Sequence, residues 1–125
     1  GVQTCALPIY FGFLLLKAKK YGLGFPFKHR SLDLHSIAAT KYLEIKDELL
    51  VEEGHSKMNL SNVLAFCGIP DERRQVSENI MKKEGKAHNG LDDAELEAEC
   101  LNRILFGRGL FERFKRYPIP IYLQK

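Results

Sequence analysis

The chain has 125 residues, of which 45% are hydrophobic and 28% are charged, with a formal net charge of +3. These values fit a single globular domain and exclude a disordered tail, and the mild positive charge permits a nucleic-acid partner without arguing for one. No apolar run approaches the ~20 residues of a membrane span, and the cysteines form no CxxC pair, so we expect reduced thiols in a cytoplasmic protein and no structural zinc.

The first nine residues, "GVQTCALPI", are similar to the translation of a common sequencing adapter. In that adapter GTG CAG ACG TGT GCT CTT CCG ATC encodes the residues that follow Gly1. We therefore interpret residues 1–9 as an adapter scar and residues 10–125 as the C-terminal part of a longer domain, and we give Cys5 no role.

The first predicted helix begins at Phe11 and ends near Gly22. Its apolar residues recur at helical spacing, and lysines fill its last turn, where the helix dipole favours cations. The apolar stripe consists of Phe11, Leu14, Leu15 and Ala18. The following "GLGFPF" is expected to be a loop, and His29 then lies in a solvated basic segment, with phosphate contact as the alternative.

Two capped helices are predicted next. Asp33 should cap a helix through "LHSIAATKYL", in which His35 faces solvent or assists the cap, and Asn59 should cap "LSNVLAFC", which Gly68 ends. Between them, residues 44–58 are expected to form a surface excursion, with or without a helical turn, in which His55 has no role. The residues expected to be buried are Leu34, Ile37, Ala38, Tyr42, Leu60, Val63, Leu64 and Cys67.

The last part of the chain contains the clearest helix, at residues 91–106, after a polar and partly helical connection at 69–87. Its predicted buried stripe is Leu91, Ala94, Ala98, Leu101 and Leu105, and Cys100 is expected to be a buried thiol like Cys67. The tail "YPIPIYL" fits an extended edge or docking strand. The basic runs "KAKK" and "RFKR" are expected to be solvated faces, with contact to a nucleic-acid backbone as the alternative.

A histidine and two aspartates lie where this helix begins. Asp93 falls in its first turn, where the dipole stabilises a carboxylate, and Asp92 is rotated by ~100°, so the two carboxylates should diverge and one of them alone should face a given site. His88 precedes them and can exchange a proton near neutral pH, while a carboxylate suits Mg²⁺ or Mn²⁺. By spacing alone, a plain helix start remains the alternative.

The whole string "AHNGLDDAELEAECLNRIL" resembles the third motif of the DEDDh 3′–5′ exonucleases, the family of ribonuclease T and polymerase proofreading subunits. That motif reads H-x-A-L-x-D-A before a helix. His88 then matches the general base and Asp93 the last metal-binding aspartate, with Gly90 in place of the usual alanine. The segments "FGFLLLKAKKYG", "RSLDLHSIAA" and "NLSNVLAFCGIP" resemble other parts of the family in the same order, so the resemblance covers residues 11–111.

The resemblance implies an α/β, ribonuclease H-like fold, truncated here to mostly helices and short strands. It also implies two Mg²⁺ or Mn²⁺ ions as cofactors and the 3′ end of single-stranded DNA or RNA as substrate. The family's D-x-E motif is missing, and Tyr10 stands where its third ligand is expected, as if adapter T had replaced the G of an aspartate codon. The chain as written is therefore expected to have little or no nuclease activity, and its uncovered apolar faces should promote aggregation.

A second hypothesis needs no chemistry. The chain would be a mostly helical module that uses its basic edges and the "YPIPIYL" tail to bind a nucleic acid or a protein. An upstream reading frame with D-x-E and an aspartate before "FGF" would favour the exonuclease, and a complete, unrelated N-terminus would favour the module.

Overall fold

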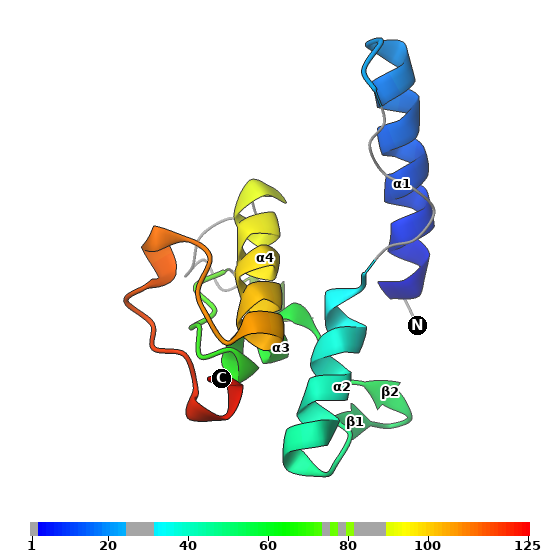
Figure 1. Ribbon diagram of the computed structural model, residues 1–125. Coiled ribbons are helices and arrows are strands. Elements are labelled where there is room, and N and C mark those ends of the chain that lie inside the picture. The colour runs from blue at the N-terminus through cyan, green and yellow to red at the C-terminus, as the bar shows by residue number, and fades with distance from the viewer. Residues whose placement is uncertain (1–2, 25–31, 74–75, 78–79, 82–89) are drawn as a thin grey trace. The chain divides into compact units, whose positions relative to one another are not determined.

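The computed structural model describes residues 3–24, 32–73, 76–77, 80–81 and 90–125 (Figure 1). The chain divides into two compact units, Gly1–Leu32 and Asp33–Lys125. The described elements are α1 Gln3–Lys20, α2 Leu34–Lys46, β1 Val51–Glu52, β2 His55–Ser56, α3 Leu60–Phe66, β3 Val76–Ser77, β4 Ile80–Met81, α4 Gly90–Phe106, and the 3₁₀ turns η1 Glu112–Phe114 and η2 Ile121–Leu123.

The first unit contains α1, which covers the predicted helix and extends it N-terminally to Gln3. Gly22 closes it with φ of 63°, and the Leu23 amide donates to the Ala18 carbonyl at 2.9 Å. The predicted apolar stripe is only partly covered, since Leu14 is 49% exposed. In the described part of the chain, no helix combines the length and the apolar character that crossing a membrane requires.

The second unit is built on α2, α3 and α4, each of which contacts the other two (Figure 1). The predicted caps of α2 and α3 are confirmed: Asp33 accepts from the Ser36 amide and Asn59 from the Asn62 amide, both at 3.0 Å. The predicted inner residues of α2 and α3 are buried or pack against the core, and the thiols of Cys67 and Cys100 are fully buried as expected. The buried core comprises Leu34, Ala38, Met58, Val63, Leu64, Phe66, Cys67, Ile69, Cys100, Ile104, Phe114 and Leu123.

Two short hairpins form in the two segments for which the sequence allows a helical turn, residues 44–58 and 69–87. Asp47 caps the C-terminus of α2 with a φ of 57°. After it, β1 pairs with β2 in antiparallel register, with Val51 opposite Ser56. The two-residue turn between them, Glu53–Gly54, has positive φ at both positions, which suits the right-handed twist of a hairpin. This exposed hairpin is the predicted surface excursion. The connection after α3 contains the second hairpin, β3 with β4.

The predicted buried stripe of α4 is wrong, because none of its five residues is buried: Leu91 and Ala94 are exposed, and Ala98, Leu101 and Leu105 are half-buried. Leu91 is 67% exposed, whereas Glu99, Cys100, Arg103 and Ile104 are buried. The apolar spacing misleads because α4 turns two charged residues inward. An ion pair can be buried only where its hydrogen-bonding groups are satisfied, so its partners decide which face is covered.

Glu99 and Arg103 have such partners. The Glu99 carboxylate accepts from Arg103 Nε at 2.7 Å and from the amides of Leu110 and Phe111 at 2.8 and 2.9 Å. Arg103 also donates to the carbonyls of Cys67, Phe114 and Tyr117. Among the described residues, no buried side-chain nitrogen or oxygen lacks a hydrogen-bond partner. The pair therefore joins α4 to the end of α3 and to the C-terminal segment.

The C-terminal tail is not the predicted extended strand. The chain leaves α4 at Gly107, where φ is 65° and a Cβ atom would lie 2.6 Å from the Leu123 carbonyl oxygen. Leu123, in η2, is only 2% exposed, and the Tyr122 hydroxyl donates to the Phe66 carbonyl at 2.7 Å. The tail folds back because its apolar residues complete the core of the same unit. A free docking strand would leave that core exposed to solvent.

Candidate active site

Asp93 lies in the first turn of α4, which begins at Gly90. Its side chain is 28% exposed, and its Oδ1 atom is 3.5 Å from Nη1 of Arg73. Arg73 is in the segment that follows α3. The carboxylate therefore sits between the start of α4 and a stretch of chain twenty residues earlier.

Arg73 is itself held by short hydrogen bonds. Its Nε and Nη2 atoms donate to the two oxygens of Asp71 at 2.9 and 2.8 Å, and the Ser61 hydroxyl of α3 donates to Asp71 at 2.6 Å. The hydrogen bonds from the Arg73 guanidinium hold the pKa of the Asp71 carboxyl well below its usual range. Hydrogen bonding to Asp71 likewise raises the pKa of Arg73. Ser61, Asp71 and Arg73 thus form a clamp beside Asp93.

Asp92 forms an ion pair with a different arginine, Arg113. Its Oδ1 atom accepts from Nη1 of Arg113 at 3.0 Å, and Nη2 of Arg113 lies 2.8 Å from Glu95. The rotation around the helix does give the neighbouring carboxylates separate partners, as expected. Both nevertheless line one pocket, so the prediction that only one of them faces a given site is wrong.

That pocket has a volume of about 440 Å³. Three segments enclose it: the residues after α3, the first half of α4 and the region of η1. Its walls combine apolar and charged side chains, and carboxylates and guanidinium groups are both present. The lining residues are Ile69, Pro70, Glu72, Arg73, Asp92, Asp93, Leu96, Arg113, Phe114, Arg116 and Tyr117.

Glu97 and His35 are two further titratable residues of the second unit. Burial raises the pKa of Glu97, and the charge of Asp93, one helical turn earlier, adds to that effect. His35 was expected to face solvent or to assist the cap. Instead its Nδ1 atom is 2.7 Å from the Met58 carbonyl oxygen, which gives the ring a structural partner.

The residues described do not make up the ligand set that the family resemblance implies. His88 lies outside the described residues, and Tyr10 belongs to α1 in the first unit. Within the described ranges, no three histidine, cysteine, aspartate or glutamate side chains come together as a metal site. Asp93 is one hard oxygen ligand, and one carboxylate does not fit a pair of divalent ions.

Sequence reasoning located Asp93 at the start of a helix and named Arg113 only as part of a basic run, but it missed Arg73 and Tyr117. The local pattern carried only one weak signal for these residues, the basic run "RFKR" at 113–116. Nothing near Arg73 in the sequence indicates that it contacts a residue of α4. These residues meet only because the segments flanking α4 pack against its first turns.

Comparison with known proteins found no matching family model, no match among curated proteins and no match among solved structures. The resemblance to the DEDDh exonucleases therefore rests on the motifs of this chain alone.

Proposed function

We propose that the chain is the C-terminal part of a 3′–5′ exonuclease of the DEDDh type, which hydrolyses phosphodiester bonds at the 3′ ends of single-stranded DNA or RNA. In this proposal Asp93 is a metal ligand and His88 the general base. Divalent ions in such enzymes lower the pKa of a water molecule and stabilise the attacking and leaving oxygens. Upstream sequence would supply the remaining ligands.

The observation that carries the proposal is the setting of Asp93. Its carboxylate lies at a helix N-terminus, where the dipole favours the charged form, and it opens onto a pocket large enough for a nucleotide-sized ligand. Arg73, fixed by Asp71, contacts the same carboxylate and restricts its orientation. A positioned acidic side chain at the wall of a pocket is what a ligand for a substrate-facing ion requires.

The test extends the reading frame upstream in the source DNA and incubates the extended protein with Mg²⁺ and a 5′-labelled single-stranded oligonucleotide. Progressive shortening from the 3′ end is expected. Asp93→Asn and His88→Ala should each slow shortening by about 100-fold or more, because each removes a group that acts on the reacting atoms. The chain as written should show little or no activity.

Asp47→Asn is the matched control, since it removes the same charge at an exposed residue that does not line the pocket. It should change the rate by less than about threefold. Undiminished shortening by the Asp93→Asn and His88→Ala variants would refute the site. An extended protein that binds the oligonucleotide without shortening it would support the non-catalytic binding module instead.

A further inference from the structure

The segment around η1 places two arginines and two aromatic rings on the pocket. The amides of Phe114, Lys115 and Tyr117 each donate to the carbonyl three residues earlier, at 3.0–3.2 Å. Side chains three residues apart are eclipsed in such turns. Arg113 and Arg116 therefore share one side, and Phe114 and Tyr117 share the next. We call these four residues the arginine–aromatic ledge.

Each arginine of the ledge is stacked on the ring that follows it in sequence. The guanidinium carbon of Arg113 is 4.5 Å from the centre of the Phe114 ring, and that of Arg116 is 4.7 Å from the centre of the Tyr117 ring. Stacking fixes the plane of a guanidinium and leaves the N–H groups at its edge to bind acceptors. The two stacked pairs thus present donors in fixed planes at one pocket.

The buried ion pair of α4 anchors the backbone of the ledge. Arg103 donates to the carbonyls of Phe114 and Tyr117 at 3.0 and 3.1 Å, and Glu99 accepts from the Phe111 amide. Phe114 is only 6% exposed. The rings are therefore held before any ligand arrives, which lowers the entropic cost of binding.

The arginines of the ledge can still bind a ligand. Their side chains are 44% and 67% exposed, and Arg116 lies 3.6 Å from its partner, Glu72. Exposed ion pairs of this kind contribute only about 0–1 kcal/mol. A guanidinium has several N–H donors, so Arg113, with bonds to Asp92 and Glu95, retains the capacity to bind a further anion.

We propose that the arginine–aromatic ledge binds single-stranded nucleic acid, with Arg113 and Arg116 on successive phosphates and a base against the apolar wall at Leu96. Guanidinium groups suit phosphates, and an apolar or aromatic wall accepts the face of any base. The segment 108–117 favours this partner over a cationic one, because it carries Arg108, Arg113, Lys115 and Arg116 against Glu112. The ledge would hold the strand beside Asp93, so its biological meaning rests on the proposed exonuclease.

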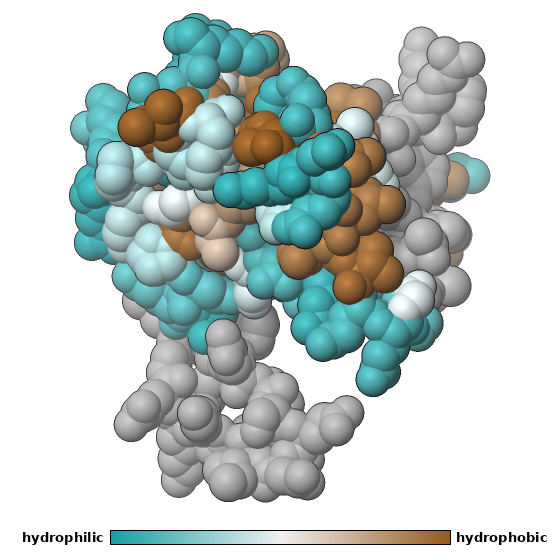
Figure 2. All heavy atoms as spheres, turned by 90° about the horizontal axis from the view of Figure 1, so that it is seen from below, coloured by the Kyte–Doolittle hydropathy of each residue, from teal (hydrophilic) through white to brown (hydrophobic). Residues whose placement is uncertain are grey.

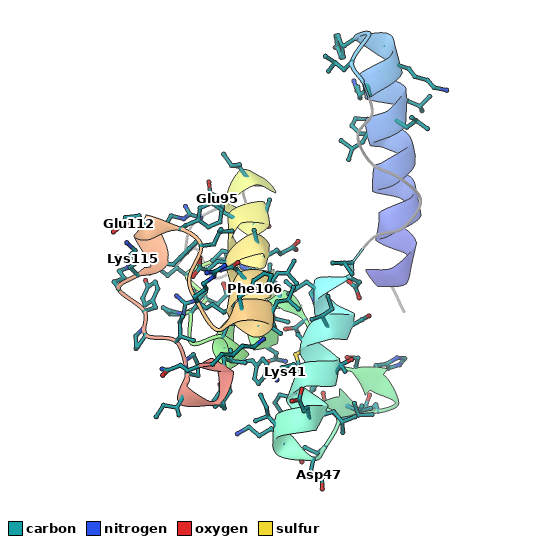
Figure 3. All side chains as sticks on the ribbon, viewed as in Figure 1. Lys41, Asp47, Glu95, Phe106, Glu112 and Lys115 are labelled. Atoms are coloured by element: carbon teal, nitrogen blue, oxygen red, sulfur yellow. The ribbon has the colours of Figure 1, made fainter. Side chains whose placement is uncertain are left out.

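The chain offers matched control residues for this inference. Lys115 lies in the same segment, is 69% exposed, pairs with Glu112 and does not line the pocket. Figure 3 shows Glu112 and Lys115 at the outer edge of the segment, and Glu95 on the side of α4 that faces it. Lys57 pairs with Glu52 on the β1–β2 hairpin. Loss of either lysine, like loss of a ledge arginine, removes the cation of an exposed ion pair.

The experiment measures the fluorescence anisotropy of a labelled oligothymidylate with the full chain in EDTA, where metal-dependent hydrolysis cannot occur. Arg113→Gln/Arg116→Gln should weaken binding at least tenfold and reduce the slope of log affinity against log salt by about 1 to 1.5, the value for two phosphate contacts on a single strand. Lys57→Gln/Lys115→Gln should weaken it less than threefold. Arg113→Lys/Arg116→Lys should keep most of the salt slope but bind several-fold more weakly.

If the two glutamine variants weakened binding equally, general charge attraction would explain the binding and the ledge would be wrong. The ledge would also be wrong if the wild-type chain did not bind the oligonucleotide. Polyglutamate competing as well as unlabelled oligonucleotide would also overturn it, in favour of an acidic peptide. Circular dichroism at matched temperatures confirms that the variants fold. If the ledge variants lost binding while the extended protein still shortened the oligonucleotide, the ledge would be refuted and the proposed exonuclease would be retained. If the chain bound the oligonucleotide at the ledge but the extended protein did not shorten it, the ledge would be retained and the exonuclease refuted.

Discussion

Asp71 determines where Arg73 can lie, and through Arg73 it affects the surroundings of Asp93. The bonds from Arg73 to Asp71 are 2.8 and 2.9 Å, whereas its contact with Asp93 is 3.5 Å. Charge-assisted hydrogen bonds are strongest when short and paired. Asp71 therefore fixes the guanidinium, and the guanidinium in turn makes a longer contact with the Asp93 carboxylate.

The lowered pKa of Asp71 predicts an acid-dependent stability. Because the folded state favours the charged carboxylate, Asp71 stabilises the fold above its ordinary pKa of about 4, and this contribution is lost as pH falls below that value. Asp71→Asn should lower the free energy of unfolding at pH 7 by about 1–3 kcal/mol. The difference in the free energy of unfolding between this variant and the wild type should become smaller as pH falls. Urea unfolding followed by circular dichroism at several pH values measures it.

Asp47→Asn provides the control. Asp47 is exposed at the end of α2 and points outward (Figure 3), and asparagine tolerates its left-handed backbone. This variant should keep the wild-type stability within about 0.5 kcal/mol at every pH. A constant difference between Asp71→Asn and wild type from pH 7 to pH 3 would contradict the assignment.

At the scale of elements, the helices that could be predicted are those whose signals are local. Asp33 and Asn59 each cap a helix with a bond to an amide three residues later, so a short sequence window contains the whole cause. The position of Asp93 in a first turn is predictable for the same reason. The contact of Arg73 with Asp93 is not, since it spans twenty residues and depends on how the segments pack.

The buried face of α4 shows why apolar spacing alone was insufficient. Arg103 reaches the Cys67 carbonyl across 36 positions of sequence, and Glu99 binds amides 11 and 12 residues ahead. Leu91 fits the apolar period yet is exposed. A pattern of hydrophobicity treats Glu99 as a surface residue, because it contains no information about those distant partners.

Glu99→Gln should therefore destabilise the second unit. All three groups that bind Glu99 are donors, so the NH2 group of a glutamine would face either Arg103 or the two backbone amides without an acceptor, and Arg103 would be buried without its counter-charge. A loss of about 3–5 kcal/mol in the free energy of unfolding is expected. Glu112→Gln, at a side chain that is 83% exposed, should change it by less than about 1 kcal/mol. Equal effects would show that the pair does not hold the C-terminal segment.

For the whole molecule, the described core lies entirely in the second unit. Every buried core residue falls between Leu34 and Leu123, and among the described side chains of α1 none is buried. Phe13, Leu16 and Tyr21 are instead 54%, 68% and 64% exposed. On the face seen in Figure 2, apolar side chains form patches between hydrophilic ones. Apolar surface of this kind promotes association between chains.

A chain that begins at Asp33 should keep the thermal stability of the full chain and associate less. Because the removed residues contribute nothing to the described core, the unfolding midpoint by calorimetry should stay within about 3 °C, which corresponds to less than about 1 kcal/mol for a domain of this size. Light scattering should show less assembly than for the full chain. Full-length Phe13→Ser/Leu16→Ser should reduce assembly in the same direction, because it removes exposed apolar area without shortening the chain. A midpoint lowered by about 8 °C or more in the shortened chain would show that residues before Asp33 stabilise the second unit after all.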